Sequence, residues 1–213
     1  MKRTLIVWCA VSVAAVAALA QSTFQNLDFE SARLLFTDPP FNRAIAPTNA
    51  LPDWMAFSGS DQLSAVPYGA GGVFYPVMLS SQTNGGSLGG FFSVVLSGAG
   101  SAAGSISQTA QVPLNARSLL FMIGAFYYGP FSVSVDGQNL SFRAMSATPN
   151  YTLYGADIST FEGQTTTLAF ESLGGITILD DIQFSSEPIP EPGVLALLLL
   201  GGGVLLCWRR GFR

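Results

Sequence analysis

An uncharged, almost wholly apolar run near the C-terminus, Gly193–Trp208, sets the first limit on how this chain can fold. No face of the run is polar, which disfavours the alternative of a core helix in a soluble domain. The run is slightly shorter than the roughly 20 residues of a typical membrane span, but Trp208 and the basic residues Arg209, Arg210 and Arg213 suit a membrane interface. We therefore predict one transmembrane helix over residues 193–208, with the arginines in the cytoplasm and the preceding chain outside.

The N-terminus has the order of features that defines a secretory signal peptide. Lys2 and Arg3 come first, an apolar stretch follows, and Ala18-Leu19-Ala20 offers small residues at a cleavage site. We expect export through the Sec pathway and a mature chain that begins at Gln21. The predicted organisation is a signal peptide (1–20), an ectodomain (21–187) and a C-terminal segment (188–213).

The C-terminal segment joins three features in one order: the triplet Pro190-Glu191-Pro192, the apolar run, and the arginine cluster at the end. This order resembles the PEP-CTERM sorting signal of Gram-negative bacteria. The resemblance covers only this segment. It implies recognition of the triplet by an exosortase, a membrane cysteine protease or transpeptidase, during passage through the inner membrane. It also implies transfer of the ectodomain to the cell surface or to an exopolysaccharide matrix. Taken alone, the triplet is a stiff extended linker, because its prolines favour polyproline II.

The composition of the ectodomain excludes several functional classes. It contains no His, Cys or Lys, so Ser-His-Asp and Cys-His nucleophiles and the usual zinc sites are ruled out. Four arginines against twelve acids give a net charge of −8, which disfavours a nucleic-acid partner. Asp180 and Asp181 are adjacent, and neighbours on a regular strand face opposite sides, so they do not form a glycosidase pair. We expect a protein that is not an enzyme.

Short apolar or alternating stretches recur about every ten residues from Phe91 onward, and no segment has helical periodicity apart from one turn near residues 158–162. This pattern predicts an all-β sandwich. Asp136-Gly137 predicts a tight hairpin turn. The predicted strands cover residues 26–30, 54–57, 73–79, 91–96, 104–112, 119–127, 131–135, 140–143, 151–157, 165–171 and 176–184.

Several degenerate motifs follow one another as in a known fold. They include an opening Asn26–Glu30, an early Trp54, Ile106-Ser107-Gln108, Phe131–Gly137, and a closing Leu179-Asp180-Asp181-Ile182. In this order they resemble the galactose-binding-like jelly roll of many carbohydrate-binding modules, over most of the ectodomain. The resemblance implies a jelly-roll β-sandwich.

Four residues are candidates for a binding or metal site. Trp54, the only tryptophan of the ectodomain, is either a platform for a sugar ring or a core residue. Asp180 lies in an apolar row from Ile176 to Phe184, so it is buried unless a bulge changes the register. The jelly-roll resemblance implies that Asp28, Glu30 and Asp180 could hold a structural calcium ion. The alternative is an Asp180 that accepts hydrogen bonds from backbone amides at a strand bend, or faces solvent.

Two functional hypotheses follow. The first is an exported protein, made as a single-pass inner-membrane precursor, with a structural or adhesive role in the envelope or exopolysaccharide matrix. The alternative is a carbohydrate-binding module for an extracellular polysaccharide. Apart from calcium, no cofactor is expected.

Overall fold

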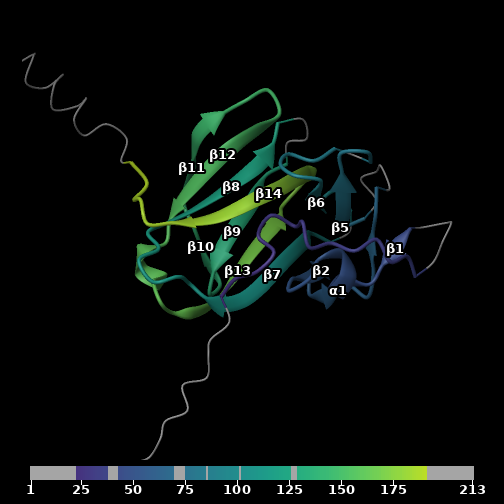
Figure 1. Cartoon of the computed structure of the whole chain (residues 1–213), viewed down its shortest axis with the longest axis horizontal. Helices are drawn as coiled ribbons and strands as arrows, with labels where there is room; N and C mark the ends of the chain where they lie inside the picture. Colours follow the sequence, from purple (N-terminus) through teal and green to yellow (C-terminus); the bar gives the residue numbers. More distant parts are fainter. Residues whose placement is uncertain are drawn as a thin grey trace, which may run out of the picture.

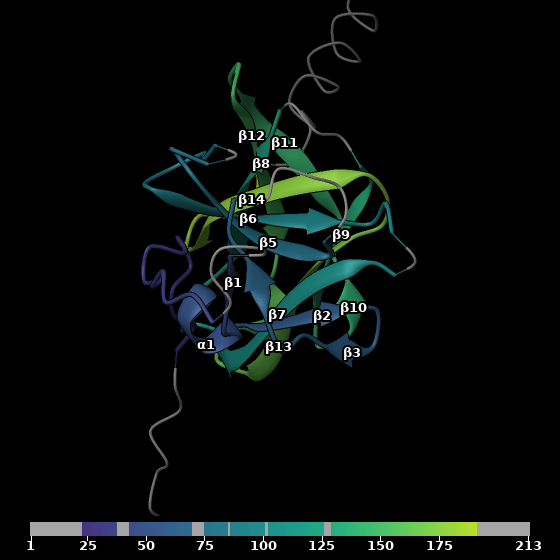
Figure 2. The same cartoon turned by 90° about the vertical axis from the view of Figure 1, so that its right-hand side faces the viewer.

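The computed structural model describes residues 23–37, 43–69, 75–84, 86–100, 102–125 and 129–190. Within these ranges the chain forms two six-stranded antiparallel sheets that pack against each other, and a small two-stranded sheet beside them (Figures 1 and 2). The predicted all-β sandwich is confirmed. Two short helical elements accompany the strands: α1 (Pro47–Ala50) and the 3-10 helix η1 (Ser159–Phe161).

Sheet 1 has the strand order β10–β9–β13–β7–β2–β3, and sheet 2 has the order β11–β12–β8–β14–β6–β5. The strands of sheet 1 are β10 (Gln138–Asn139), β9 (Phe131–Val135), β13 (Thr165–Ser172), β7 (Gly104–Gln111), β2 (Met55–Ser58) and β3 (Asp61–Gln62). Those of sheet 2 are β11 (Phe142–Ala147), β12 (Tyr151–Asp157), β8 (Ser118–Gly124), β14 (Ile176–Ser185), β6 (Phe92–Ser97) and β5 (Val77–Ser81). The small sheet pairs β1 (Ala44–Ile45) with β4 (Val66–Pro67).

Most predicted strands are present where the hydrophobic pattern placed them. In β7 the residues alternate between the core and the outer face, with Ile106 fully buried and Thr109 exposed. Asp136 and Gly137 form the predicted turn between β9 and β10, and both have positive φ values, 52° and 74°. The strand predicted at 140–143 is displaced, because β10 begins directly after this turn and β11 begins at Phe142.

The strand predicted at residues 26–30 is wrong. Asn26 and Phe29 have positive φ values of 49° and 59°, which a β-strand does not allow. The Asn26 side-chain oxygen instead accepts a hydrogen bond from the Ser31 amide at 3.0 Å, and the Phe29 amide donates to the Asn26 carbonyl. An asparagine that bonds its own local backbone favours a turn over a ladder, and that preference overrides the alternating pattern.

The core between the two sheets is centred on an aromatic cluster. Phe121 of β8 is fully buried and lies with its ring centroid 5.3 Å from that of Phe170 in the opposite sheet. Phe131, Phe142 and Tyr154 surround the same ring at centroid distances of 6.1, 5.8 and 5.9 Å. Because these rings come from β8, β9, β11, β12 and β13, the cluster joins both sheets at the end of the sandwich that carries β11.

A β-bulge in β14 changes which side chains face the core. Leu179 pairs with Ile123 before the bulge, and Phe184 pairs with Leu119 after it. Asp181 sits in the bulge with a φ of 46°. The side chains of Ile182 and Phe184 therefore turn toward the core while Asp180 stays on the outer face of sheet 2. The regular alternation that would place Asp180 and Ile182 on one face is wrong for this reason.

Among the residues that the structure describes, no helix is both long enough and apolar enough to cross a membrane. The predicted signal peptide and the predicted transmembrane helix over 193–208 lie outside the described residues. The described chain reaches Pro190, so the folded domain is seen up to the first residue of the Pro190-Glu191-Pro192 triplet.

Replacing Phe121 by alanine tests the aromatic cluster. Because the ring is fully buried among four others, Phe121→Ala should lower the free energy of unfolding by about 3–5 kcal/mol. Chemical denaturation followed by tryptophan fluorescence measures this change. Leu114→Ala is the control, since Leu114 is 72% exposed and its truncation should change stability by less than about 0.5 kcal/mol. Equal effects of the two substitutions would contradict the assignment of the core.

Candidate functional site

Trp54 belongs to the core and is not a platform for a sugar ring. Its side chain is 4% exposed and contacts the rings of Phe29 and Phe170 at centroid distances of 5.8 and 6.5 Å. The indole Nε1 donates a hydrogen bond to the Asn26 carbonyl at 3.0 Å. Of the two interpretations left open by the sequence, the structure supports the core residue.

Two of the predicted acids, Glu30 and Asp180, accept hydrogen bonds from the same short stretch of chain, residues 89–93. The loop at residues 86–91 connects β5 to β6 and covers the outer face of sheet 2, where Leu88 packs on Met78, Val95 and Ile178. Glu30 Oε1 accepts hydrogen bonds from the amides of Phe91 and Phe92 at 2.7 and 2.8 Å. The other carboxylate, Asp180, accepts hydrogen bonds from Gly89 and Ser93, on either side of the two residues that bind Glu30.

Asp180 is 1% exposed and accepts hydrogen bonds at both oxygens. Oδ2 accepts from the Gly89 amide at 2.9 Å and from the Ser93 hydroxyl at 2.6 Å, and Oδ1 accepts from the Asp181 amide at 2.7 Å. Burial raises the pKa of Asp180 to about 6, and these three donors offset only part of that effect. The loop thus buries the Asp180 carboxylate, which fastens the loop to sheet 2.

The structure does not assemble the predicted acids into a calcium site. Asp28 Oδ1 accepts a hydrogen bond from the Glu30 amide at 3.2 Å, and Glu30 and Asp180 are bonded to different parts of the loop. Within the described part of the chain, no three His, Cys, Asp or Glu side chains come close enough to hold a metal ion. These acids instead match the alternative prediction, in which a carboxylate accepts hydrogen bonds from backbone amides.

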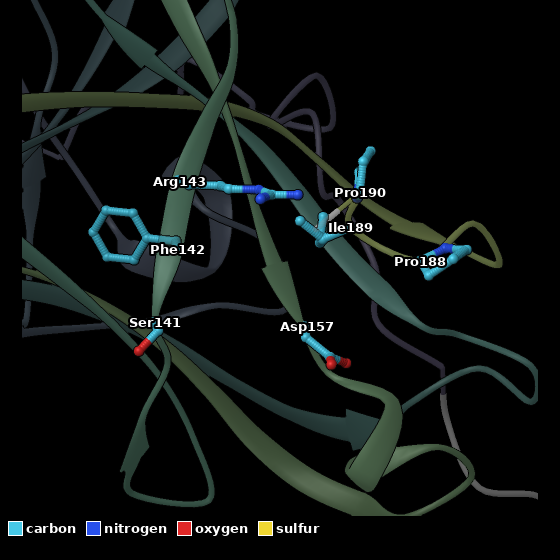
Figure 3. A pocket seen from close by; sticks show the side chains of 8 residues that line it. Ser141, Phe142, Arg143, Asp157, Pro188, Ile189 and Pro190 are labelled. Atoms are coloured by element: carbon cyan, nitrogen blue, oxygen red, sulfur yellow. The ribbon is translucent and has the colours of Figure 1, made fainter. Parts of the chain in front are cut away.

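A cleft of about 630 Å³ lies at the opposite end of sheet 2, beside the exit of the C-terminal segment. Figure 3 shows its walls: Arg143 of β11 and Asp157 of β12 on one side, and the chain at 188–190 on the other. The remaining lining residues are Ser141, Phe142 and Gly155. Of the residues proposed from the sequence, only Pro190 contributes to this cleft.

The hollow in the cleft floor exists because β12 has a glycine at its centre. A Cβ atom on Gly155 would lie 2.5 Å from Ile189 Cδ1, 3.1 Å from Met145 Cγ and 3.2 Å from Leu120 Cδ2. Ile189 therefore rests directly on the backbone of sheet 2, half-buried between two apolar side chains. A glycine in a strand interior is a known sign of close approach by another segment, and that signal was present in the sequence.

The two charged groups of the cleft differ in their surroundings. The backbone and hydroxyl of Ser159 hydrogen-bond to Asp157 and lower the pKa of its carboxyl group, with a smaller contribution from Arg117. Arg143 is half-buried and points toward Ile189 and Pro190 (Figure 3). Its guanidinium makes no hydrogen bond or ion pair with any residue that the structure describes.

The other residues predicted for sorting and processing lie outside the described ranges. These are Glu191, Pro192, Arg209, Arg210 and Arg213 at the C-terminal end, and Ala18, Ala20 and Gln21 at the signal-peptide end.

No protein-family model and no curated protein matches the sequence. Three solved structures are similar to the chain. The carbohydrate-binding module TmCBM61, in complex with β-1,4-galactotriose, is 12% identical with a TM-score of 0.41, covering 77% of this chain and 97% of its own. A family 11 carbohydrate-binding module from Clostridium thermocellum, in complex with a β-1,3-1,4-mixed-linked tetrasaccharide, is 10% identical with a TM-score of 0.34, covering 69% and 96%.

The third structure is the enzymatically active domain of tailspike protein 4 from bacteriophage CBA120, 16% identical with a TM-score of 0.34. The match covers 62% of this chain and 19% of the phage protein. At these TM-scores the three likenesses carry no ligand, partner or activity over to this chain.

The buried Asp180 gives stability a pH dependence of defined sign. Its pKa rises from an ordinary 3.8 to about 6 on folding, so the folded state binds the proton more tightly. The stability that the folded state gains from binding this proton more tightly is fully present below about pH 4. It is lost as the pH rises through about 6. The free energy of unfolding of the wild type, minus that of Asp180→Asn, should fall by roughly 2–3 kcal/mol between pH 4 and 7. Urea denaturation across this range measures it, and a flat or rising difference would be the contrary result.

Proposed function

We propose that this protein is an exported bacterial surface protein, sorted through its C-terminal segment and used as a structural or adhesive part of the envelope or exopolysaccharide matrix. The precursor crosses the inner membrane once with the sandwich outside, and an exosortase-like enzyme acts at Pro190-Glu191-Pro192. The observation that carries this proposal is the ordered sequence of triplet, apolar run and arginines behind a signal peptide.

The position of Pro190, the first residue of the triplet, relative to the sandwich supports a processing site. β14 is the last strand that the structure describes and ends at Ser185, and beyond it Ile189 packs on Gly155 of sheet 2. Pro188 and Pro190 are exposed. A cut at the triplet would leave both sheets and the aromatic cluster intact, because every strand that the structure describes precedes it.

We assign no catalytic reaction to the domain. Its sequence contains no His and no Cys, the residues that most often serve as general base or nucleophile. Its buried acid, Asp180, is bonded to a loop on the outer face of a sheet.

Binding of a neutral polysaccharide is the second candidate, and the outer face of sheet 1 favours it. Ser105, Ser107 and Thr109 of β7 alternate with buried residues. On the neighbouring strand β13, Thr167 lies opposite Thr109, and Thr165 is on the same face. The hydroxyls of Thr109 and Thr167 are 2.7 Å apart. Hydroxyl groups both donate and accept hydrogen bonds, as sugar hydroxyls require. Along β7 and β13 this face carries a single charged residue, Glu171.

Cell fractionation tests the sorting proposal. Deleting residues 188–213 should move the protein from the membrane and surface fractions to the soluble exported fraction. Replacing only Pro190, Glu191 and Pro192 by alanine should leave the anchor in place, so that the uncut precursor accumulates in the inner membrane. Unchanged fractionation of both variants would exclude sorting by this segment.

Retention on the matrix polysaccharide of the producing cell tests the second candidate. Thr109→Arg places a long charged side chain in the middle of the hydroxyl-rich face and should abolish retention in a pull-down. Ser146→Arg is the matched control, because Ser146 is exposed on β11 in the other sheet. A wild type that is not retained, or two variants that behave alike, would argue against this face as a sugar-binding surface.

A further inference from the structure

We propose that the cleft formed by β11, β12 and residues 188–190 binds one uronate unit of an acidic polysaccharide. The Arg143 guanidinium binds the carboxylate of the sugar, Asp157 and Ser141 bind its hydroxyl groups, and Ile189 contacts its apolar face. The site lies on sheet 2 and is distinct from the hydroxyl-rich face of sheet 1. A role of this binding in adhesion rests on the proposed function, whereas the binding itself needs no sorting.

The first support is the placement of the two charged side chains of the cleft. Arg143 of β11 lies opposite Gly155 of β12, and Asp157 follows two residues further along β12. Arg143 and Asp157 are therefore diagonal neighbours on one face of sheet 2, a relation that places residues about 7–8 Å apart. Figure 3 shows both side chains extending to the same side, toward residues 188–190. The spacing leaves room for a ligand that contacts both groups.

The second support is an unpaired positive charge. Arg143 is half-buried, and its guanidinium makes no hydrogen bond or ion pair with any residue that the structure describes. A partly desolvated guanidinium favours a carboxylate, which it binds through two parallel hydrogen bonds. The net charge of −8 repels a polymer with closely spaced carboxylates. A polysaccharide whose uronate units are separated by neutral sugars fits both observations.

The third support is Asp157, which distinguishes a sugar from a simple anion. The Ser159 amide donates a hydrogen bond to Asp157 Oδ1 at 2.9 Å, and the backbone and hydroxyl of Ser159 lower the pKa of this carboxyl group. Asp157 is therefore ionised at neutral pH. It is also exposed, and a carboxylate can accept about four hydrogen bonds, so sugar hydroxyls can still donate to it. The exposed hydroxyl of Ser141 on the same wall can donate or accept.

The fourth support is the apolar surface between these polar groups. Ile189 rests on Gly155, and Pro188 and Pro190 line the cleft on either side of it. A pyranose ring carries C–H groups on its faces and hydroxyls at its edge, so it can lie on Ile189 while its edge reaches the polar side chains. The volume of about 630 Å³ is in the range of small-molecule sites, which combine apolar walls with a few placed polar groups.

Chemical-shift titration of the isotope-labelled full chain in a neutral detergent tests the site. Methyl glucuronide or methyl galacturonide should shift the amide resonances of Arg143 and Gly155, with a Kd at least about tenfold below that of the matching neutral glycoside. Acetate and alanine carry a carboxylate without ring hydroxyls and should bind at least about tenfold more weakly than the uronide. Equal binding of the neutral glycoside, tighter binding of alanine, or no shift with either uronide would overturn the proposal.

Substitutions in the cleft assign the contacts. Arg143→Gln should weaken uronide binding by about ten- to hundredfold, and Arg143→Lys, which keeps the charge but loses the planar fork, should weaken it less. Asp157→Asn should weaken both the uronide and the neutral glycoside by about three- to tenfold. Arg33→Gln is the matched control, because Arg33 is exposed and does not line the cleft. Wild-type affinity in Arg143→Gln, or equal losses in Arg143→Gln and Arg33→Gln, would overturn the assignment.

Urea denaturation of the same variants separates binding from folding. Arg143 and Asp157 project from the outer face of sheet 2, so the variants should keep the wild-type midpoint. The titration contains neither a sorting enzyme nor the matrix. Its failure therefore leaves the sorting proposal standing, and failed sorting leaves the binding site standing.

Discussion

The β-bulge at Asp180–Asp181 determines how the rest of this sandwich is arranged. Before the bulge, Leu179 faces the core, and after it Ile182 and Phe184 do. The extra residue keeps apolar side chains inside on both halves of β14 and leaves Asp180 outside, beneath the loop that it fastens. Without the register change, the second half of the strand would expose its apolar residues and bury Gln183 and Ser185.

The bulge also links distant parts of the chain. The Ile182 amide donates a hydrogen bond to the Leu27 carbonyl at 2.9 Å, which ties the N-terminal turn to the last strand. Glu30, just after that turn, accepts hydrogen bonds from Phe91 and Phe92, next to the residues that bind Asp180. The same strand carries the chain to the cleft where Ile189 rests on Gly155. Loop, N-terminal turn and C-terminal exit therefore all depend on β14.

How far the sequence predicts this structure depends on how far apart in the sequence the interacting residues are. Alternating stretches such as β7 and β13, and the Asp136-Gly137 turn, were predictable because local pattern and burial agree. Asn26–Glu30 was mispredicted because an asparagine side chain bonds the local backbone. For Asp180 the sequence offered both a metal and an amide-bound interpretation, and only the fold shows which donors reach it.

The cleft could not be predicted because its parts are far apart in the sequence. Arg143, Gly155 and Ile189 meet only through the pairing of β11 with β12 and the path of the chain after β14. The proposed sorting segment, in contrast, is a local pattern that was predicted from the sequence alone.

Mass spectrometry of the mature protein isolated from the producing cell tests this account most directly. We expect an N-terminus at Gln21 and a C-terminus at or beside the Pro190-Glu191-Pro192 triplet, with no chain ending at Arg213 outside the inner membrane. A surface-located protein that retains Arg213 would contradict processing at the triplet, and with it the claim that this segment directs the sandwich to its destination.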